Sequence, residues 1–563
     1  MMSNRNGGYR SHLRYWLTYI IGLIAILAII VVGCFYMAKP YLDSFVKQEI
    51  ARRSIKAETS EVSIIGKVNL TNVTLPVPAG VSLKIGAISG RPPISLIPGT
   101  FTLYNVDLKY HNIHLRIPEI SLNSVFLKEK DRTIASHLLQ SIMRIELASI
   151  VAPDIQLSVQ NTNNQIEKFE VKNFQLSDFK NGHIHSVSME NIDLKMLTTN
   201  GAKKTHFTTT SDSIKAHDID INYAYSIILG KNNPIHKERN VIGPVSLKKV
   251  MINVLEKGGK NASFSLGSFK TSGLKMEPFK QMPGQLIKTY LQAKKAENQK
   301  DKKITQRDTL MNNLLHMTLV DAEADNLTVK TPQFEVTFES FHFKQSLWQH
   351  PIPKKLLISF NNLAFLPKKM EEKDLELLKQ MGVERLDLSE KINITYDERK
   401  HVLSHNLSFD IKNVGSGKIS AKVVDVDERL FSAQKDLMTA VSQNFGISEV
   451  HILYTDAGFI DKSFSYLAQN LNDKKHDLKK ELYDDFYLMM TQSPKIFLKN
   501  HAEAEKISKS LGEFAKNPQT LIIKMRAKDN KGITMADFES ALQNNLSTVL
   551  NKIHLTIKNE ASP

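Results

Sequence analysis

The segment GKVNLTNVTL (residues 66–75) is matched 33 residues later by GTFTLYNVDL (residues 99–108). In both copies apolar and polar residues alternate, which is the pattern of a half-buried strand, and an asparagine, Asn72 or Asn105, interrupts the alternation. Asparagine tolerates backbone angles that most residues avoid. The repeat therefore predicts a strand, a kink or bulge at the asparagine, and a resumed strand.

The match continues beyond these two segments. LKIGAIS (residues 83–89) corresponds to LRIPEIS (residues 115–121), at a spacing of 32 residues. The step from asparagine to two alternating apolar residues returns three times later in the chain, although an Asn-rich and strand-rich chain also produces such steps by chance. These later steps are Asn191–Leu194, Asn326–Val329 and Asn362–Phe365.

Short alternating runs occur along most of the chain, for example Ile155/Leu157/Val159 and Phe334/Val336/Phe338. Regular short strands with turn residues between them favour an extended antiparallel sheet over βαβ units. Because each strand has one apolar face, we predict a curved sheet with an apolar inner side.

Helical spacing of apolar residues interrupts the strands in a few places and dominates the last third of the chain. Pro494 predicts a break in the longest helical segment, and Thr534 with Asp537 predicts the cap of a further helix. The fold class is therefore mainly β, with an α+β C-terminal part. The predicted helical segments are residues 41–56, 132–144, 283–316, 427–444 and 461–516.

Residues 15–38, YWLTYIIGLIAILAIIVVGCFYMA, contain no charged residue. As a helix they would measure roughly 36 Å, enough to cross a hydrocarbon core of about 30 Å. The segment before them carries Arg5, Arg10 and Arg14 and no acidic residue, which predicts a cytoplasmic N-terminus and an exported C-terminal part. Aromatic residues at the two ends predict the membrane interfaces: Tyr15, Trp16, Tyr19, Phe35 and Tyr36.

Two other interpretations of this segment stay open. A cleaved signal peptide would have a shorter apolar core, of about 7–15 residues, and small residues at its cleavage site. Val31-Val32-Gly33-Cys34 is similar to the lipobox of bacterial lipoproteins, in which cleavage leaves a lipidated cysteine, although apolar residues follow here. A buried cysteine within an apolar span also accounts for Cys34.

The composition is that of an ordinary folded protein, with 42% hydrophobic and 23% charged residues. A chain of 563 residues is too long for one compact core. Because Cys34 is the only cysteine, the exported part contains no disulfide. The predicted domains are residues 1–14 (cytoplasmic), 15–38 (transmembrane), 39–275 (β-rich repeats), 276–316 (basic helical insert), 317–425 (second β-rich region) and 426–563 (α+β).

The net charge of +16 favours negatively charged partners. An exported basic protein is drawn to an anionic membrane surface, whereas membrane anchorage and the lack of aromatic-interleaved basic motifs disfavour nucleic acid. In the insert, a basic run is either a solvated helix face or a set of contacts with anionic headgroups. The run comprises Lys294, Lys295, Lys300, Lys302, Lys303 and Arg307.

No motif for a cofactor or a phosphate-binding loop is complete. The segment at residues 414–418, VGSGK, is similar to such a loop, but Lys412 replaces the first glycine and Ile419 replaces the magnesium-binding Ser or Thr. It therefore predicts a turn.

The sequence also contains few candidate catalytic or metal-binding groups. In the second of the two closest histidine pairs both side chains would share one strand face, but no cysteine or obvious carboxylate partner joins them. Asp456 and Asp461 are typical of a turn and a helix cap rather than an acid–base pair. We therefore predict no catalytic, cofactor-binding or metal-binding residues and no enzyme activity. The histidine pairs are His111/His114 and His183/His185.

A single N-terminal span followed by Gly-x-apolar-x-Leu-x-Asn-Val-x-Leu repeats resembles the AsmA-like envelope proteins of bacteria and related proteins anchored in the inner membrane. The resemblance covers mainly residues 10–125, and residues 448–558 are similar to the ends of alphaproteobacterial proteins of that kind. It implies a periplasmic β-groove and a role in lipid movement or outer-membrane homeostasis.

Two functions follow as hypotheses. The first is a non-enzymatic, single-pass protein of the bacterial inner membrane, with most of its chain in the periplasm, that binds lipid acyl chains or supports outer-envelope assembly. The alternative is a scaffold or secretion accessory that binds other envelope proteins through its β-edges and helical tail. The predicted partners are the inner membrane and either phospholipid or envelope proteins, without a cofactor.

Overall fold

The structure is a computed structural model that divides into two compact units, Met1–Ala202 (unit 1) and Lys203–Pro563 (unit 2). The predicted span at residues 15–38 and the helices predicted at 132–144 and 283–316 lie outside the described residues. Among the helices that are described, none is long and apolar enough for a membrane crossing. The structure describes residues 40–560 except 42, 45, 49, 53, 64–65, 76–80, 93–97, 128–144, 161–163, 201–202, 225–238, 257–260, 277–316, 350–351, 370–375, 377–378, 380–381, 384, 432–440, 442–443, 471–476, 499–500 and 544–546.

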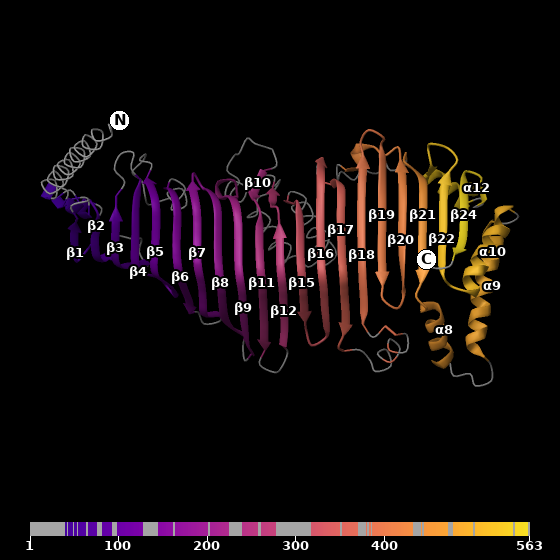
Figure 1. Cartoon of the computed structure of the whole chain (residues 1–563), viewed down its shortest axis with the longest axis horizontal. Coiled ribbons are helices and arrows are strands. Elements are labelled where there is room, and N and C mark those ends of the chain that lie inside the picture. The colour runs from indigo at the N-terminus through magenta and orange to yellow at the C-terminus, as the bar shows by residue number, and fades with distance from the viewer. Residues whose placement is uncertain are drawn as a thin grey trace, which may run out of the picture. The chain divides into compact units, whose positions relative to one another are not determined.

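Unit 1 is an antiparallel sheet in which each strand pairs with the next one along the chain (Figure 1). The described residues between 40 and 52 are helical, and Val46 and Ile50 pack against a core that contains Val73 and Ile85. The helix predicted at 41–56 is therefore confirmed in its first part, whereas Lys56 forms a β-bridge with Thr74. The strands are β1 (Thr59–Val62), β2 (Val68–Thr74), β3 (Val81–Arg91), β4 (Gly99–Tyr110), β5 (Ile113–Leu127), β6 (Ile145–Gln160), β7 (Asn164–Lys180) and β8 (His183–Asn200).

Unit 2 contains twelve long strands that pair antiparallel in chain order. They are β9 (Lys203–Asp220), β11 (Val245–Glu256), β12 (Asn261–Thr271), β15 (Asp321–Lys330), β16 (Phe334–Gln349), β17 (Ile352–Pro367), β18 (Leu386–Asp397), β19 (Val402–Ile411), β20 (Gly415–Val424), β21 (Gly446–Asp456), β22 (Thr520–Ala527) and β24 (Ile553–Glu560). The short β23 (Ile533–Thr534) pairs with β21, and a separate small sheet contains β10 (Arg239–Ile242), β13 (Leu274–Met276) and β14 (Met317–Leu319).

The longer helices that the structure describes in unit 2 lie in the last third of the chain, so the predicted α+β C-terminal part is confirmed. Thr534 and Asp537 cap α11 as predicted, because each backbone N–H donates to the other side chain. The predicted break at Pro494 is wrong, since α9 continues past this buried proline to Leu498. The helices are η1 (Glu428–Phe431), α8 (Phe459–Asn470), α9 (Leu478–Leu498), α10 (Glu503–Lys516), α11 (Met535–Gln543) and α12 (Ser547–Leu550).

The predicted kinks at asparagine are confirmed at all five positions. Each of these asparagines lies inside a strand with a positive φ, from 46° to 53°. At each of these positions, here called a bulge, the ladder skips the asparagine and then resumes without ending the strand. The five residues are Asn72, Asn105, Asn191, Asn326 and Asn362.

The bulges of neighbouring strands lie beside one another. The pairs Thr71–Ala87 and Val73–Ile85 enclose Asn72 and Gly86, and the next ladder skips Gly86 and Asn105 in the same way. The two strands approach closely at Gly86, where a Cβ would lie 3.1 Å from the Cβ of Asn105. The bulges thus form a row across the sheet.

This row explains why the strands are longer than the short strands that the sequence predicts. The strands β6, β7 and β8 contain 16, 17 and 18 residues. Pro118 and Pro153, which suggest turns in the sequence, lie within β5 and β6 at positions that the ladders skip. A proline is tolerated at a bulge because no ladder hydrogen bond requires its missing N–H.

The backbone angle at the bulge predicts the effect of substitutions at Asn105. We expect Asn105→Val to lower the free energy of unfolding by about 1–2 kcal/mol, because a β-branched residue is strained at positive φ. Asn105→Gly is expected to change it by only a few tenths of a kcal/mol. Urea denaturation followed by circular dichroism measures both. Equal losses for the two variants would show that the side chain, rather than the angle, matters.

Candidate functional site

One face of the sheet in unit 1 carries continuous rows of apolar side chains. Six residues from six consecutive strands are register partners in such a row, and all six are half-buried. Side chains alternate between the faces of a strand, so the neighbours of these residues lie on the opposite face. The row comprises Leu83, Leu108, Leu115, Leu157, Phe169 and Leu194.

A longer apolar row crosses nine strands of unit 2, from β15 to β24. Only its first residue is fully buried, and the other eight are half-buried. The row comprises Ala322, Phe343, Ile358, Ile392, Leu407, Ile419, Ile452, Ile523 and Ile557.

Phenylalanines gather on this face over β16 and β17. The ring centroids of Phe341 and Phe360 are 5.0 Å apart, and those of Phe338 and Phe341 are 6.3 Å apart. Phe365 packs beside Phe334 and is still 41% exposed. None of these five rings is buried. The predicted apolar face therefore exists, whereas its predicted curvature stays a prediction.

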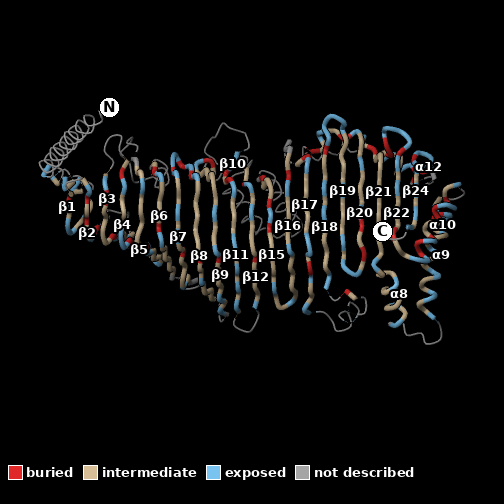
Figure 2. The backbone as a smooth tube through the Cα atoms, viewed as in Figure 1, coloured by how far each residue is buried: buried red, intermediate tan, exposed pale blue. Residues whose placement is uncertain are grey.

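Within the described residues, no second layer covers the middle of this face. The strands β11, β12, β15 and β16 make their main contacts with adjacent strands. Figure 2 shows the same strands mostly in the colour of half-buried residues. A filled core would bury a group of phenylalanines this large.

Helices do cover the apolar face near one end of each unit. In unit 1, Val46 and Ile50 of the segment at residues 40–52 pack against the core. In unit 2, Ile507 of α10 belongs to a cluster with Ile553 against which Ile557 packs. The apolar row of unit 2 is thus closed at β24 and uncovered over β15 and β16.

The opposite face of the sheet is polar and carries ion pairs between neighbouring strands. In unit 1, Lys168 on β7 lies 2.9 Å from Asp193 on β8 and 3.0 Å from Glu170. These hydrogen bonds raise the pKa of Lys168. The two faces therefore differ sharply in polarity.

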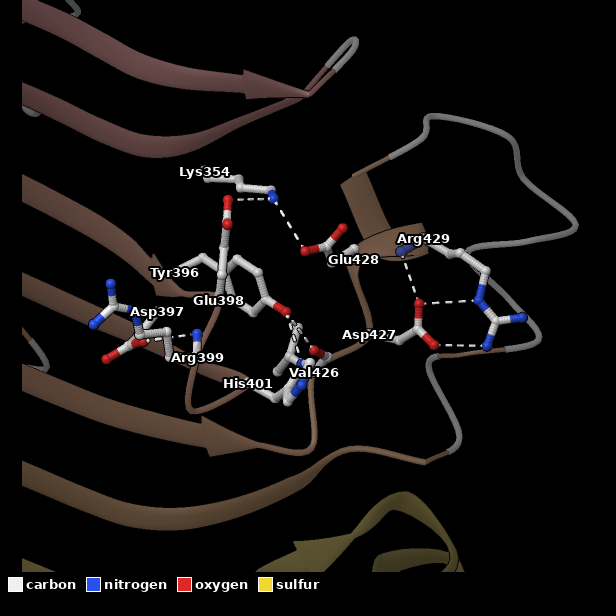
Figure 3. A network of polar contacts seen from close by, with 10 residues as sticks. All are labelled: Lys354, Tyr396, Asp397, Glu398, Arg399, His401, Val426, Asp427, Glu428 and Arg429. Atoms are coloured by element: carbon white, nitrogen blue, oxygen red, sulfur yellow. Dashed lines mark hydrogen bonds and ion pairs between the residues drawn. The ribbon is translucent and has the colours of Figure 1, made fainter.

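A second candidate site is a polar network where β17, β18 and η1 meet (Figure 3). The side chain of Lys354 is fully buried, and its Nζ lies 2.6 Å from Oε1 of Glu398 and 3.4 Å from Oε1 of Glu428. The ammonium also lies 5.5 Å from the centre of the Tyr396 ring. Glu398 and Glu428 follow Lys354 by 44 and 74 residues in the chain. No local sequence pattern could therefore have revealed this network.

Tyr396 connects the same network to the next loop. Its hydroxyl donates to the carbonyl of Val426 at 2.8 Å and lies 3.2 Å from Nδ1 of His401. Burial, together with nearby carboxylates such as that of Glu428, raises the pKa of the phenol. Its ring packs 4.9 Å from that of Phe431.

Asp427 and Arg429 form the outer part of the network. Two guanidinium nitrogens of Arg429 lie 2.9 Å and 2.6 Å from the two carboxylate oxygens of Asp427. These hydrogen bonds lower the pKa of Asp427 to about 2. Asp427 therefore stays ionised at any physiological pH.

The geometry of this network favours a structural role. A nucleophile or general base must reach a substrate, and the Lys354 side chain has no exposed surface. Its two glutamates compensate the buried ammonium. We conclude that the network joins β17 to the β18–β19 hairpin and to η1.

Most of the residues that the sequence singles out for a membrane role lie outside the described residues. This holds for Arg5, Arg10, Arg14 and the aromatic residues at both ends of residues 15–38. It holds equally for the basic run from Lys294 to Arg307. These assignments stay predictions.

Several other groups that the sequence singles out have ordinary partners. His114 forms a 2.8 Å contact with Asp107, which lowers the pKa of that carboxyl. Asp456 accepts a hydrogen bond from the backbone N–H of Gly458, as a turn residue does. Asp461 binds Lys479 at 2.7 Å, which joins α8 to α9. Among the described residues, no three His, Cys, Asp or Glu side chains come together as metal ligands.

The aromatic group on β16 was only partly visible in the sequence. The run FEVTFESFHF (residues 334–343) places an apolar residue, a phenylalanine except for Val336, at every second position apart from one step of three, from Phe338 to Phe341. That step falls beside the bulge at Asn362, whose side chain donates to Glu339. A search for alternation with a single step of three would have found the whole group.

Comparisons with known proteins reach only the C-terminal part of the chain. A family model with the description "Uncharacterized protein" matches residues 408–560, which is less than half of the chain. No curated protein matches the sequence. The matched segment contains α8 to α12 and the closed end of the apolar row in unit 2.

Proposed function

We propose that this chain is a non-enzymatic, membrane-anchored protein of the bacterial periplasm whose apolar sheet face binds lipid acyl chains. The observation that supports this most directly is the group of half-buried phenylalanines over β16 and β17, without a covering layer among the described residues. A contiguous exposed apolar surface on a folded protein is typical of a site for a ligand, a membrane or another protein.

The size of the hydrophobic effect makes acyl chains a suitable occupant. Each methylene group that leaves water contributes about 0.8 kcal/mol. Ten methylenes along the uncovered part of this row, over Phe343 and Ile358, would contribute roughly 8 kcal/mol before the loss of chain entropy. The apolar rows run across the strands and are uninterrupted over several of them, which suits a long, featureless chain.

The predicted anchor and the net charge of +16 agree with this function. A span at residues 15–38 would keep the sheet beside the bilayer, and a basic protein is attracted to anionic lipids. The resemblance to AsmA-like proteins implies the same kind of ligand. A role in outer-envelope assembly would follow from moving or holding such lipids.

The proposal is tested on the full chain purified from bacterial membranes. We expect native mass spectrometry to detect co-purified lipids and a fluorescence assay to detect accelerated lipid exchange between donor and acceptor liposomes. A chain that carries no lipid and leaves the exchange rate unchanged would rule out acyl-chain binding.

A scaffold for other envelope proteins is the second candidate, because two surfaces of the C-terminal part are open among the described residues. On α9, four large apolar side chains are more than half exposed, and β24 pairs only with β22. Crosslinking in cells that recovers one protein in equal amount, together with absent lipid, would favour this function over lipid binding. The four side chains are Leu488, Met489, Ile496 and Phe497.

A further inference from the structure

A hollow of about 520 Å³ lies on the polar face of the sheet formed by β19 to β24. Its position follows from strand alternation, because its charged residues are the neighbours of the apolar row that contains Ile452 and Ile523. All of its lining residues except Ser404 and Asn406 lie within the segment that matches the family model. The charged and titratable residues in its wall are Lys422, Glu449, His451, Lys524, Arg526 and His554.

Two cross-strand rows bring these side chains together. Lys422, Glu449, Arg526 and His554 are successive register partners on β20, β21, β22 and β24. The neighbouring row places His451 beside Lys524. The two rows are two residues apart along each strand, which is roughly 6.6 Å on the same face, so one small ligand can contact both rows.

The charges of the hollow are unbalanced. Lys422 lies 2.7 Å from Glu449, and Arg526 lies 4.0 Å from the same carboxylate. Among the described residues, Lys524 has no ion-pair partner in this wall. Three permanent cations therefore face one carboxylate, which leaves a surplus of two positive charges before any histidine is protonated.

His451 adds a second, independent observation. Its Nε2 atom is covered and has no hydrogen-bond partner among the described residues. A buried polar atom without a partner is unfavourable, and a ligand oxygen that enters between the two rows would supply one. The hydroxyls of Ser420 and Thr556 line the same hollow and can donate to such a ligand.

We propose that this hollow binds a phosphate group. A phosphate monoester carries up to two negative charges and several acceptor oxygens, which matches the surplus of two cations and the donors of Lys524, Arg526 and His451. A monocarboxylate would leave one charge and most donors unsatisfied. The proposal does not depend on acyl-chain binding, because the hollow lies on the opposite face from the apolar rows.

The phosphate group has two possible sources, a free phosphate or the headgroup of a lipid. Isothermal titration calorimetry on the full chain in detergent, at constant ionic strength, compares three probes: inorganic phosphate, acetate and dihexanoyl phosphatidic acid below its micelle concentration. We expect saturable binding of phosphate with one site and no binding of acetate. Competition between phosphatidic acid and phosphate identifies a headgroup site, and its absence identifies a site for free phosphate.

Three variants test whether the named residues form the site. We expect Lys524→Gln to weaken phosphate binding roughly fivefold and Glu449→Gln to strengthen it by a similar factor, as expected for one charge about 5 Å away in a solvated site. Lys391→Gln is the matched control, because Lys391 is an exposed lysine on the same face of β18 and outside the hollow. It is expected to leave the affinity unchanged.

The opposite signs of the two changes in the hollow separate binding from folding, since a damaged fold would weaken binding in both variants. The proposal is overturned if inorganic phosphate does not bind, or if Glu449→Gln weakens binding. It is also overturned if Lys391→Gln weakens binding as much as Lys524→Gln, because the cause would then be the general basic field. Loss of lipid exchange with phosphate binding intact would contradict only the acyl-chain proposal.

Discussion

Phe338→Glu is expected to weaken acyl-chain binding by at least about tenfold. The substitution removes an aromatic ring from the apolar face, where burying such a side chain contributes about 1.5–3 kcal/mol. It also places a carboxylate beside Leu327, the register partner of Phe338 on β15. An acyl chain on this face would have to desolvate that charge. Binding of a fluorescent fatty acid to the full chain measures the change.

Thr337→Glu is the matched control for this substitution. Thr337 is the preceding residue on β16, is also half-buried and lies on the polar face opposite Thr328 and Ala364. The substitution Thr337→Glu introduces the same charge into the same strand as Phe338→Glu, but on the polar face. Acyl-chain binding is therefore expected to persist. Equal loss in both variants would show that the charge acts through the strand and not through the apolar face.

The stability of Phe338→Glu separates an uncovered face from a filled core. Phe338 is half-buried, whereas Val73 in unit 1 is completely buried. On an uncovered face the new carboxylate keeps contact with water, so the thermal midpoint is expected to fall by only a few degrees. In a filled core a large-to-small change at phenylalanine alone costs about 3–5 kcal/mol. A collapse of the fold on this substitution would contradict the uncovered face.

The double variant Glu398→Gln/Glu428→Gln is expected to lower the free energy of local unfolding by about 3 kcal/mol. It leaves the fully buried ammonium of Lys354 without a countercharge, and removing one side of a buried ion pair costs about 3–5 kcal/mol. We expect a loss at the lower end of this range because the two glutamates are 48% and 46% exposed and therefore compensate the ammonium partly through solvent. Hydrogen exchange in residues 352–360 and 396–403 reports this opening.

Lys354→Met is the control that distinguishes an uncompensated charge from lost packing. Methionine fills a similar volume, and the two half-exposed glutamates can return to water, so the expected change is within about 1 kcal/mol. A larger loss for Lys354→Met than for the double glutamine variant would contradict this account of the network. It would indicate that the ion pair itself stabilises the fold.

The strand pattern and its interruptions were determined by the sequence. Alternation of apolar and polar residues placed the strands, and the recurring asparagine indicated the bulges, because both depend on the residue type and its nearest neighbours. The same holds for the cap at Thr534 and Asp537, which are only three residues apart. Strand length was not accessible in this way, since Pro118 and Pro153 signal turns unless neighbouring strands place bulges beside them.

Only the tertiary structure decided which surfaces are covered and which distant charges meet. The sequence predicts an apolar face but not that the phenylalanines of β16 lack a covering layer among the described residues, because this depends on where other elements pack. Lys354 and its glutamates, like the cations around His451, come from segments far apart in the chain. Register between strands brings them together, and register is set by the whole sheet and not by any one segment.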